Sequence, residues 1–232
     1  DVTLSNGNIL GITKFKLFLP ETRNNEDEII GSSILSNLSF ISPRSKNLLV
    51  NINGINNNMI FQESSAKELL EINSYNEGLI FEGDESLLWN PKFKDPFIAE
   101  KISTIRVLNS NYLFKNKINL EKSIDIMTVF QKLYLNSVGK KLRHVFDYES
   151  IDEYNNLNLK NLKIYDLIVL SMNGHHSLRP HNRKFFYDLV TENIHPIYYD
   201  GDLHIRQKFI NLNRLDNFYL KKNIDESYFQ EA

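Results

Sequence analysis

The chain has 232 residues, of which 41% are hydrophobic and 24% charged, which is enough for one large domain or two small lobes with a packed core. The 27 Lys and Arg residues against 29 Asp and Glu give a formal net charge of −2. This balance argues against a dedicated nucleic-acid-binding protein, which usually carries a basic excess. There is no cysteine, so disulfides, thiolate nucleophiles and zinc sites with cysteine ligands are excluded.

The sequence shows no sign of a membrane span or a signal peptide. No apolar run approaches the roughly 20 residues that cross a bilayer, and the first residues lack a charged region followed by an apolar one. We therefore expect a soluble protein, with its compartment unassigned. Because the chain begins with Asp1 rather than Met, we also expect it to be a processed or shortened piece.

The first third of the sequence reads mainly as strands. Residues 12–19 alternate between polar and apolar, which places Lys14 and Lys16 on one face of a strand and apolar side chains on the other. A polar turn then leads into a helix from Glu28 to about Leu38, with acidic residues in its first turn, where the helix dipole favours them.

A hairpin is expected next. Asn53 and Gly54 lie between two apolar segments, residues 48–52 and 58–62, and Asn-Gly is a strong hairpin signal even though the loop looks longer and rich in Asn. Residues 78–82 read as one further strand.

Helical patterns dominate the rest of the chain. Ser64 or Ser65 is expected to cap a short helix that runs through Leu70. After residue 85 the longer helical stretches lie around residues 97–109, 120–136 and 150–172. We therefore predict an α+β protein of two lobes, namely a sheet-rich N-terminal lobe over residues 1–85 and a mainly helical C-terminal lobe over residues 86–232.

Residues 173–202 carry most of the candidate chemistry. They contain four of the six histidines, His175, His176, His181 and His195. If the segment is an antiparallel hairpin centred on Thr191, Asn182 and Asp200 are equally far from the turn and lie side by side at its open end. A register slip of one residue would leave them near each other but facing opposite ways.

An amide and a carboxylate brought together in this way suit a hard cation such as Mg²⁺, which prefers oxygen ligands and also binds phosphate oxygens. Asp202 adds a second carboxylate. Nucleotide phosphoryl transfer needs such a site, because its catalysis rests mostly on positioning and charge neutralisation. Zinc held by the neighbouring histidines is disfavoured, because adjacent side chains diverge on an extended chain and no His-x-x-x-His spacing occurs.

The segment also resembles a known catalytic motif. Residues 175–182, His-His-Ser-Leu-Arg-Pro-His-Asn, look like the protein-kinase loop H-R-D-L-K-P-x-N in register, with Arg179 in place of the phosphate-facing lysine. Residues 200–202, Asp-Gly-Asp, take the place of the metal-binding D-F-G segment.

A longer part of the chain is similar to the CotH kinase family, the spore-coat protein H-like atypical kinases. The similar segments are residues 15–17 with Arg23 and the following helix, residues 40–44, residues 50–63 and residues 146–202. This resemblance covers roughly residues 12–202. It implies a two-lobed protein-kinase-like fold that binds ATP with Mg²⁺ or Mn²⁺ and transfers a phosphoryl group to a protein hydroxyl or another acceptor, such as a glycan.

The resemblance implies roles for residues of the first lobe. Lys16, or Lys14 on the same strand face, would contact the α- and β-phosphates. Glu28 or Glu26 would be the helix carboxylate that orients this lysine. Glu63 would lie where the two lobes join, with its backbone near the adenine.

In the second lobe the implied metal ligands are Asn182, Asp200 and Asp202, and Arg179 would clamp a phosphate oxygen. One departure matters most, because Ser177 stands where kinases have the catalytic Asp, five residues before the Asn. Serine cannot act as a general base at neutral pH without help.

Several interpretations of this departure stay open. His176 or His181 could accept the proton, since imidazole titrates in the right range. A loose transition state could need little base. The site could also bind nucleotide without turnover, as a pseudokinase or scaffold module, or serve a glycan- or capsule-related enzyme that uses another nucleotide.

Overall fold

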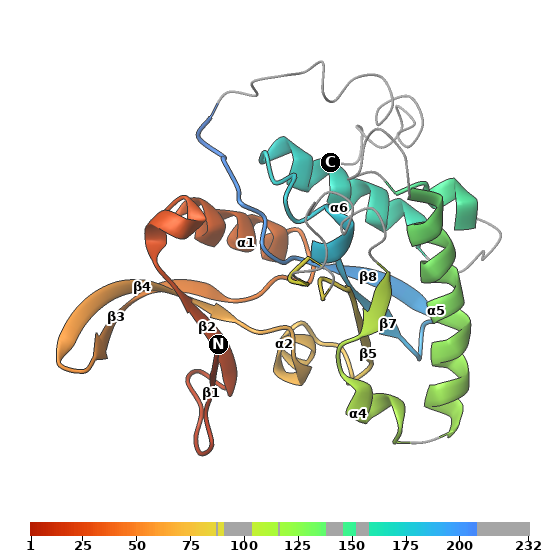
Figure 1. The fold of residues 1–232 in the computed structure, drawn as a ribbon, viewed down its shortest axis with the longest axis horizontal. Coiled ribbons are helices and arrows are strands. Elements are labelled where there is room, and N and C mark those ends of the chain that lie inside the picture. The colour runs from red at the N-terminus through yellow and green to blue at the C-terminus, as the bar shows by residue number, and fades with distance from the viewer. Residues whose placement is uncertain (87, 91–103, 116, 138–145, 152–157, 208–232) are drawn as a thin grey trace.

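The computed structural model describes residues 1–86, 88–90, 104–115, 117–137, 146–151 and 158–207. These residues form two four-stranded sheets, antiparallel throughout, with helices packed against them (Figure 1). The predicted α+β class is therefore confirmed at this level.

The first sheet has the strand order β1-β2-β4-β3, with β1 (Val2–Thr3), β2 (Lys14–Phe18), β3 (Ser45–Ile52) and β4 (Ile55–Glu63). The predicted strand and hairpin are both confirmed. Ile52 pairs with Ile55, so the hairpin turn is only two residues long and not the longer loop that we expected. Asn53 and Gly54 adopt φ values of 52° and 84°, the left-handed conformation that a tight Asn-Gly turn requires.

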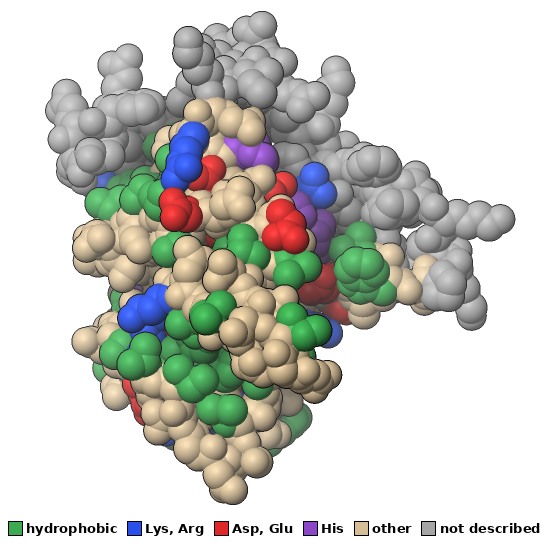
Figure 2. Space-filling model, turned by 90° about the vertical axis from the view of Figure 1, so that its left-hand side faces the viewer, with side chains coloured by type: hydrophobic (Ala, Val, Ile, Leu, Met, Phe, Trp, Pro, Cys, Tyr) green, Lys and Arg blue, Asp and Glu red, His purple; other side chains and the backbone are tan. Residues whose placement is uncertain are grey.

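The hairpin β3–β4 projects from the body of the protein. Hydrophobic side chains are exposed on the face that it presents (Figure 2), where Leu49 is 67% exposed and Ile55 66% exposed. The outer part of this hairpin is therefore stabilised by the backbone hydrogen bonds between its strands and by its tight turn more than by burial of apolar side chains.

Two helices accompany the first sheet, α1 (Asp27–Asn37) and α2 (Lys67–Ile72), and a short 3-10 turn, η1 (Pro20–Arg23), precedes α1. The helix predicted at Glu28 is confirmed. The predicted serine cap of α2 is wrong, because Ala66 is the N-cap residue and makes no side-chain cap bond. The N–H of Ser64 instead bonds the carbonyl of Lys14, which extends the sheet pairing past β4.

The second sheet has the order β6-β5-β7-β8, with β5 (Leu79–Gly83), β6 (Ile105–Val107), β7 (Lys184–Asp188) and β8 (Asn193–Ile197). β5 thus pairs with strands from later in the chain, and residue 85 does not mark a boundary between sheets. The helix predicted over 97–109 is wrong at β6, where apolar β-branched residues flank Arg106 in strand alternation. Residues 97–103 lie outside the described part.

The remaining elements are α4 (Ser110–Leu113), α5 (Lys117–Ser137), η2 (Tyr148–Ile151), α6 (Leu159–Ser171) and η3 (Pro180–Asn182). The helix predicted over 120–136 corresponds to α5. The prediction over 150–172 corresponds to the end of η2 and to α6, and its residues 152–157 are not described. None of the described helices has the length and apolar character needed to cross a membrane.

The second sheet is buried on both faces, as its nearly continuous apolar strands require. On one face Phe81 and Phe185 pack against Phe130 of α5, with ring centroids 5.2 and 4.7 Å apart. On the other face Ile80 and Phe186 join the apolar residues of α2. Figure 1 shows α5 beside the second sheet and α2 between the two sheets.

A buried ion pair joins the start of β7 to α6. Arg183 donates from Nη1 to Asp166 Oδ1 at 2.8 Å and from Nη2 to Oδ2 at 2.9 Å, and both residues are almost fully buried. Tyr148 Oη donates to Asp166 Oδ2 at 2.9 Å, and Arg183 Nε donates to the carbonyl of Leu178 at 2.9 Å. This network therefore fastens the loop before β7 to two other elements.

We expect Asp166→Ala to lower the free energy of unfolding by about 3–5 kcal/mol, because Arg183 then stays buried without its carboxylate. Tyr148→Phe removes one hydroxyl from the same network and should cost only about 1 kcal/mol. Urea unfolding of the whole chain measures both values. Equal effects of the two substitutions would contradict the dominant role of the ion pair.

Candidate functional site

The β7–β8 hairpin brings the predicted metal ligands together, with a register one residue away from the predicted one. Asp188 pairs with Asn193 and Lys184 with Ile197, so the ladder would place Asn182 opposite Tyr199 and not opposite Asp200. The alternation of the strands does not reach these side chains. Asn182 lies in η3, and Asp200 has a φ of 47° beyond the end of β8.

His176 links the two residues. Asn182 Nδ2 lies 3.0 Å from His176 Nδ1 and donates to the His176 carbonyl at 2.9 Å. The same Nδ1 atom lies 3.0 Å from the carbonyl oxygen of Asp200. The amide and the backbone of the acid thus meet at one imidazole nitrogen.

The carboxylate of Asp200 is flanked by two basic side chains. Its Oδ1 lies 3.4 Å from Arg23 Nη2, and its Oδ2 lies 3.7 Å from His176 Nδ1. Oδ1 is buried and accepts no hydrogen bond from the described residues. Arg23, which the sequence analysis gave no role at the site, comes from η1 and stacks 4.1 Å over the ring of Phe18.

Asp202 turns to a different neighbourhood. Its Oδ1 accepts a bond from Asn24 at 2.9 Å and lies 3.9 Å from His204 Nε2, and its side chain is 54% exposed. Among the described residues, Asp202 makes no hydrogen bond or ion pair with Asn182 or Asp200. Gly201 between the two acids is required sterically, since a Cβ there would lie 2.2 Å from Tyr198 Oη.

Asn182 and Asp200 fit a hard divalent cation. Both supply oxygen donors, and Mg²⁺ commonly takes only one or two protein ligands and completes its shell with waters and phosphate oxygens. The buried Oδ1 of Asp200 has Arg23 3.4 Å away but accepts no hydrogen bond from the part of the chain that the structure describes, which is consistent with a ligand atom. Within the described ranges no three His, Asp or Glu side chains gather as a metal site, so a histidine zinc site gains no support.

The other residues of the loop differ in what they can do. Ser177 is buried and donates to the carbonyl of Gly174 at 3.2 Å, so its hydroxyl stabilises the loop itself. Burial, together with the nearby His176 and Arg179, lowers the pKa of His181 to about 4. Nδ1 of His181 and Nε of Arg179 are buried without a hydrogen-bond partner in the described part. His176 is thus the better-placed proton acceptor beside Asp200.

Glu28 is buried, and no basic side chain among the described residues forms an ion pair with it. Tyr198 Oη donates to its Oε2 at 2.8 Å and Gln62 Nε2 donates to its Oε1 at 3.0 Å, while burial raises the pKa of Glu28 to about 7. No ion pair between Lys16 and Glu28 forms in the described structure. Gln62 lies directly opposite Lys16 on β4, and it is the Gln62 amide that binds the Glu28 carboxylate in place of Lys16. Glu26 pairs instead with Arg206 at 3.0 Å.

Lys16 contacts Tyr199, which lies just beyond the end of β8. Its Nζ donates to Tyr199 Oη at 2.9 Å and lies 3.8 Å from Asp1 Oδ1. Lys14 has no carboxylate within ion-pairing distance among the described residues. Both lysines line a cavity between the two sheets, which agrees with the prediction that they share one face of the strand.

Glu63 has a structural partner on the neighbouring loop. Its carboxylate accepts from Arg44 Nε at 2.9 Å and from Nη2 at 2.8 Å, and its side chain is almost fully buried. The N–H groups of Glu63 and Ser64 bond the carbonyls of Arg44 and Lys14. These two N–H groups are therefore engaged and do not face an adenine.

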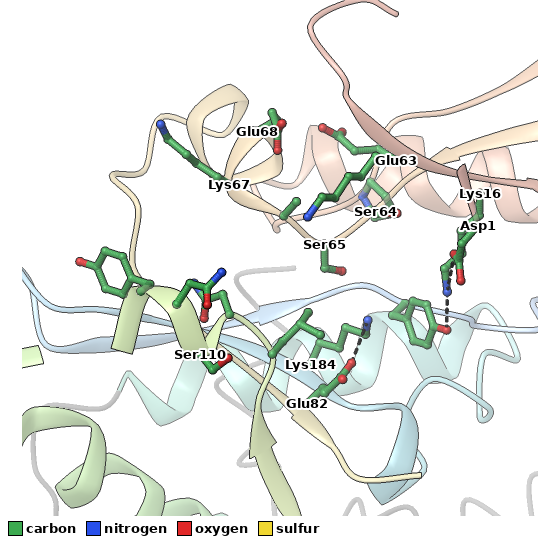
Figure 3. Close-up of a pocket in the computed structure, with 18 of the residues that line it drawn as sticks. Asp1, Lys16, Glu63, Ser64, Ser65, Lys67, Glu68, Glu82, Ser110 and Lys184 are labelled. Atoms are coloured by element: carbon green, nitrogen blue, oxygen red, sulfur yellow. Dashed lines mark hydrogen bonds and ion pairs between the residues drawn. The ribbon is translucent and has the colours of Figure 1, made fainter. Parts of the chain in front are cut away.

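The cavity between the sheets has a volume of about 650 Å³ (Figure 3). Its described lining includes six basic side chains, Lys14, Lys16, Lys67, Arg106, Lys115 and Lys184, and six acidic ones, Asp1, Glu63, Glu68, Glu77, Glu82 and Glu85. Asn182 and Asp200 are not part of this lining, but Tyr199, which immediately precedes Asp200, is. The candidate metal ligands thus lie outside the lining, and Tyr199 connects Asp200 to it along the chain.

No family model matches the chain, and no curated protein matches it either. The similarity to the CotH kinases remains a resemblance carried by motifs. Function is accordingly argued from the geometry of the site.

Sequence reasoning missed three residues of this region, Arg23, Lys184 and Tyr199. Lys184 had a readable signal, because it opens a strand whose next three residues are aromatic and buried, and a lysine in such a position needs a partner. Tyr199 follows another tyrosine, Tyr198, and the sequence does not distinguish the two. Only Tyr198 is buried in the core, while Tyr199 faces the cavity.

The environment of Glu28 generates a pH prediction. Its pKa is about 7 in the folded protein and 4.5 in the unfolded chain, so the folded state loses stability as pH rises between these values and no further above pH 7. Glu28→Gln removes this loss. We expect the stability of the variant relative to wild type to rise by up to roughly 3 kcal/mol between pH 4.5 and pH 8.

Urea unfolding at pH 5 and pH 8 measures this effect. Glu26→Gln is the matched control, because Glu26 precedes the same helix with its side chain 59% exposed. That substitution should leave the pH dependence unchanged. If wild type and Glu28→Gln show the same pH dependence, the carboxyl is not held in its neutral form.

Proposed function

We propose that the chain is a CotH-like kinase that transfers a phosphoryl group from ATP, with Mg²⁺ or Mn²⁺, to a protein hydroxyl or another acceptor such as a glycan. One observation carries the proposal. Asn182 and Asp200, which stand at the positions of the kinase metal ligands in the sequence, meet at His176, and Tyr199, the residue before Asp200, binds Lys16 in the cavity.

The cavity supports nucleotide binding. Its volume of about 650 Å³ falls within the usual range of small-molecule sites. Lys14 and Lys16 place two ammonium groups on the wall of the cavity that β2 forms, where phosphates would be held. Tyr199 accepts the bond from Lys16 and directly precedes Asp200, so the phosphate end and the metal ligands are adjacent along the chain.

The residues around the metal position have separate tasks. Asn182 and Asp200 would hold the ion, which neutralises phosphate charge when it is bound. Arg23 fixes the Asp200 carboxylate from one side. With its proton on Nδ1, His176 donates to the Asp200 carbonyl, and the Asn182 amide is held by its bond to the His176 carbonyl and not by Nδ1. Nε2 of His176 then carries the lone pair that can accept a proton from a hydroxyl.

A nucleotide-binding pseudokinase or scaffold is the second candidate. Two observations favour it. The hydroxyl of Ser177 is buried and bonded within its own loop, and Lys16 does not pair with Glu28. Both functions require nucleotide binding, so they differ only in turnover.

Binding is tested by calorimetric titration of wild type with ATP and Mg²⁺. We expect Asp200→Asn to weaken Mg²⁺-dependent ATP binding by at least about tenfold, because a carboxylate ligand and the partner of Arg23 are lost together. Asp202→Asn is the control and should change the affinity by less than about threefold, since Asp202 faces Asn24. A wild-type chain that binds no ATP would refute both candidate functions.

Turnover is tested with γ-labelled ATP, by measuring label incorporated into the chain or an added protein acceptor. We expect His176→Gln to slow incorporation by about 100-fold or more with little change in ATP affinity, because it removes the proton acceptor. His181→Gln, which alters the neighbouring buried imidazole, should slow it by less than about fivefold. Binding without any incorporation in wild type would favour the pseudokinase, and an unaffected His176→Gln would exclude His176 as the base.

A further inference from the structure

A row of charged side chains crosses the second sheet beneath the cavity. Glu82 lies directly opposite Arg106 on one side and directly opposite Lys184 on the other. Arg106 donates to Glu82 Oε1 from Nε at 3.0 Å and from Nη2 at 2.7 Å, while Lys184 Nζ lies 3.2 Å from Oε2. One carboxylate is thus shared between two cations.

Lys16 approaches the same place from the facing sheet. In Figure 3 Lys16 points down and Lys184 points up toward one end of the cavity. Their Nζ atoms lie 4.7 and 3.8 Å from the centroid of the Tyr199 ring. Two ammonium groups from opposite walls therefore converge on a single aromatic side chain.

These ammonium groups are short of acceptors. Each has three N–H donors, and the described residues give Lys184 only Glu82, and give Lys16 only Tyr199 with Asp1 farther away at 3.8 Å. Lys184 is only 9% exposed, and both its burial and the charge of Lys16 lower its pKa, while Glu82 raises it. A multivalent oxyanion between the two lysines would supply the missing acceptors and screen their repulsion.

We infer that Lys184 and Lys16 form a two-lysine subsite for a pyrophosphoryl group at the Tyr199 end of the cavity. A diphosphate has enough oxygens to reach both walls, which a single carboxylate does not. The identification of this group as the polyphosphate of ATP rests on the proposed function. Lys184 has no role in the kinase resemblance, so its part in phosphate binding is a property of this chain.

Two of the other lysines of the cavity, Lys67 and Lys115, already have surface partners. Lys67 pairs with Glu71 at 3.1 Å and Lys115 with Glu77 at 2.6 Å, and their side chains are 55% and 51% exposed. Neither contacts Tyr199 among the described interactions. Lys115→Met is therefore a matched control, because it removes one positive charge from the same cavity away from the subsite.

The experiment is a calorimetric titration of the whole chain with inorganic pyrophosphate in the absence of divalent metal. We expect wild type to bind pyrophosphate, Lys184→Met and Lys16→Met to weaken binding at least tenfold, and Lys115→Met to change it less than twofold. Lys184→Arg keeps the charge and should retain affinity within about fivefold.

Folding is controlled separately, because Lys184 is buried. Thermal unfolding of each variant is compared with wild type, and Lys184→Met combined with Glu82→Gln neutralises both ends of the pair if the single variant is unstable. The side chain of Lys16 is 25% exposed, and its ion-pair partner Asp1 is 77% exposed. Replacing Lys16 therefore leaves no buried carboxylate without its cation. The Lys16→Met result therefore keeps the inference falsifiable even if no Lys184 variant folds.

The outcomes separate this inference from the proposed function. Absence of pyrophosphate binding to wild type, or equal losses in Lys184→Met and Lys115→Met, would overturn the subsite. Pyrophosphate binding that requires Lys184 in a chain that does not bind ATP would support the subsite and remove its assignment to a nucleotide. If Lys184→Met also weakens ATP binding at least tenfold, the subsite holds the phosphates of the nucleotide.

Discussion

The buried pair of Arg183 and Asp166 determines where the candidate site can lie. Arg183 directly follows Asn182, and its guanidinium cannot leave the carboxylate of α6 without becoming a buried, unpaired cation. Its bond to the carbonyl of Leu178 fixes the loop that carries His176 and Asn182. The residues proposed for chemistry are therefore presented by a stiff support and not by a loose connection.

The support continues on the other side of the loop. Gly83 at the end of β5 packs against η3 so closely that a Cβ there would lie 1.9 Å from the carbonyl oxygen of Pro180. The hydroxyl of Tyr134 on α5 donates to the same carbonyl at 2.8 Å. β5 and α5 thus hold the short turn η3 directly, and α6 holds Arg183, the residue that follows it. This agrees with a site whose geometry must be kept.

Local signals in the sequence were sufficient for much of the fold. Alternation predicted β2, residues 78–82 read as the strand that is β5, and Asn53-Gly54 predicted the β3–β4 hairpin, because each depends on residues close together in the chain. The partners of β5 could not be predicted, since its pairing with β7 is set by packing between segments about 100 residues apart.

In the candidate site, too, some features could be predicted from the sequence, and others depend on residues far apart in the chain. Motif order was enough to predict that Asn182 and Asp200 come together. The hairpin register was missed by one residue, because the length of the turn at 189–192 cannot be read from its composition. The expected pairing of Lys16 with Glu28 failed through a competitor, Gln62, which is distant in sequence and opposite in space.

The position of β5 in the second sheet bears on how the chain folds during synthesis. Residues 1–63 contain every strand of the first sheet, so that sheet can form early. β5 leaves the ribosome next, with the buried residues Leu79, Ile80 and Phe81, but its central partner β7 follows only after α5 and α6. Until then β5 can pair only with the short strand β6, so its apolar residues lack most of their sheet, and we expect this interval to be prone to misfolding or chaperone binding.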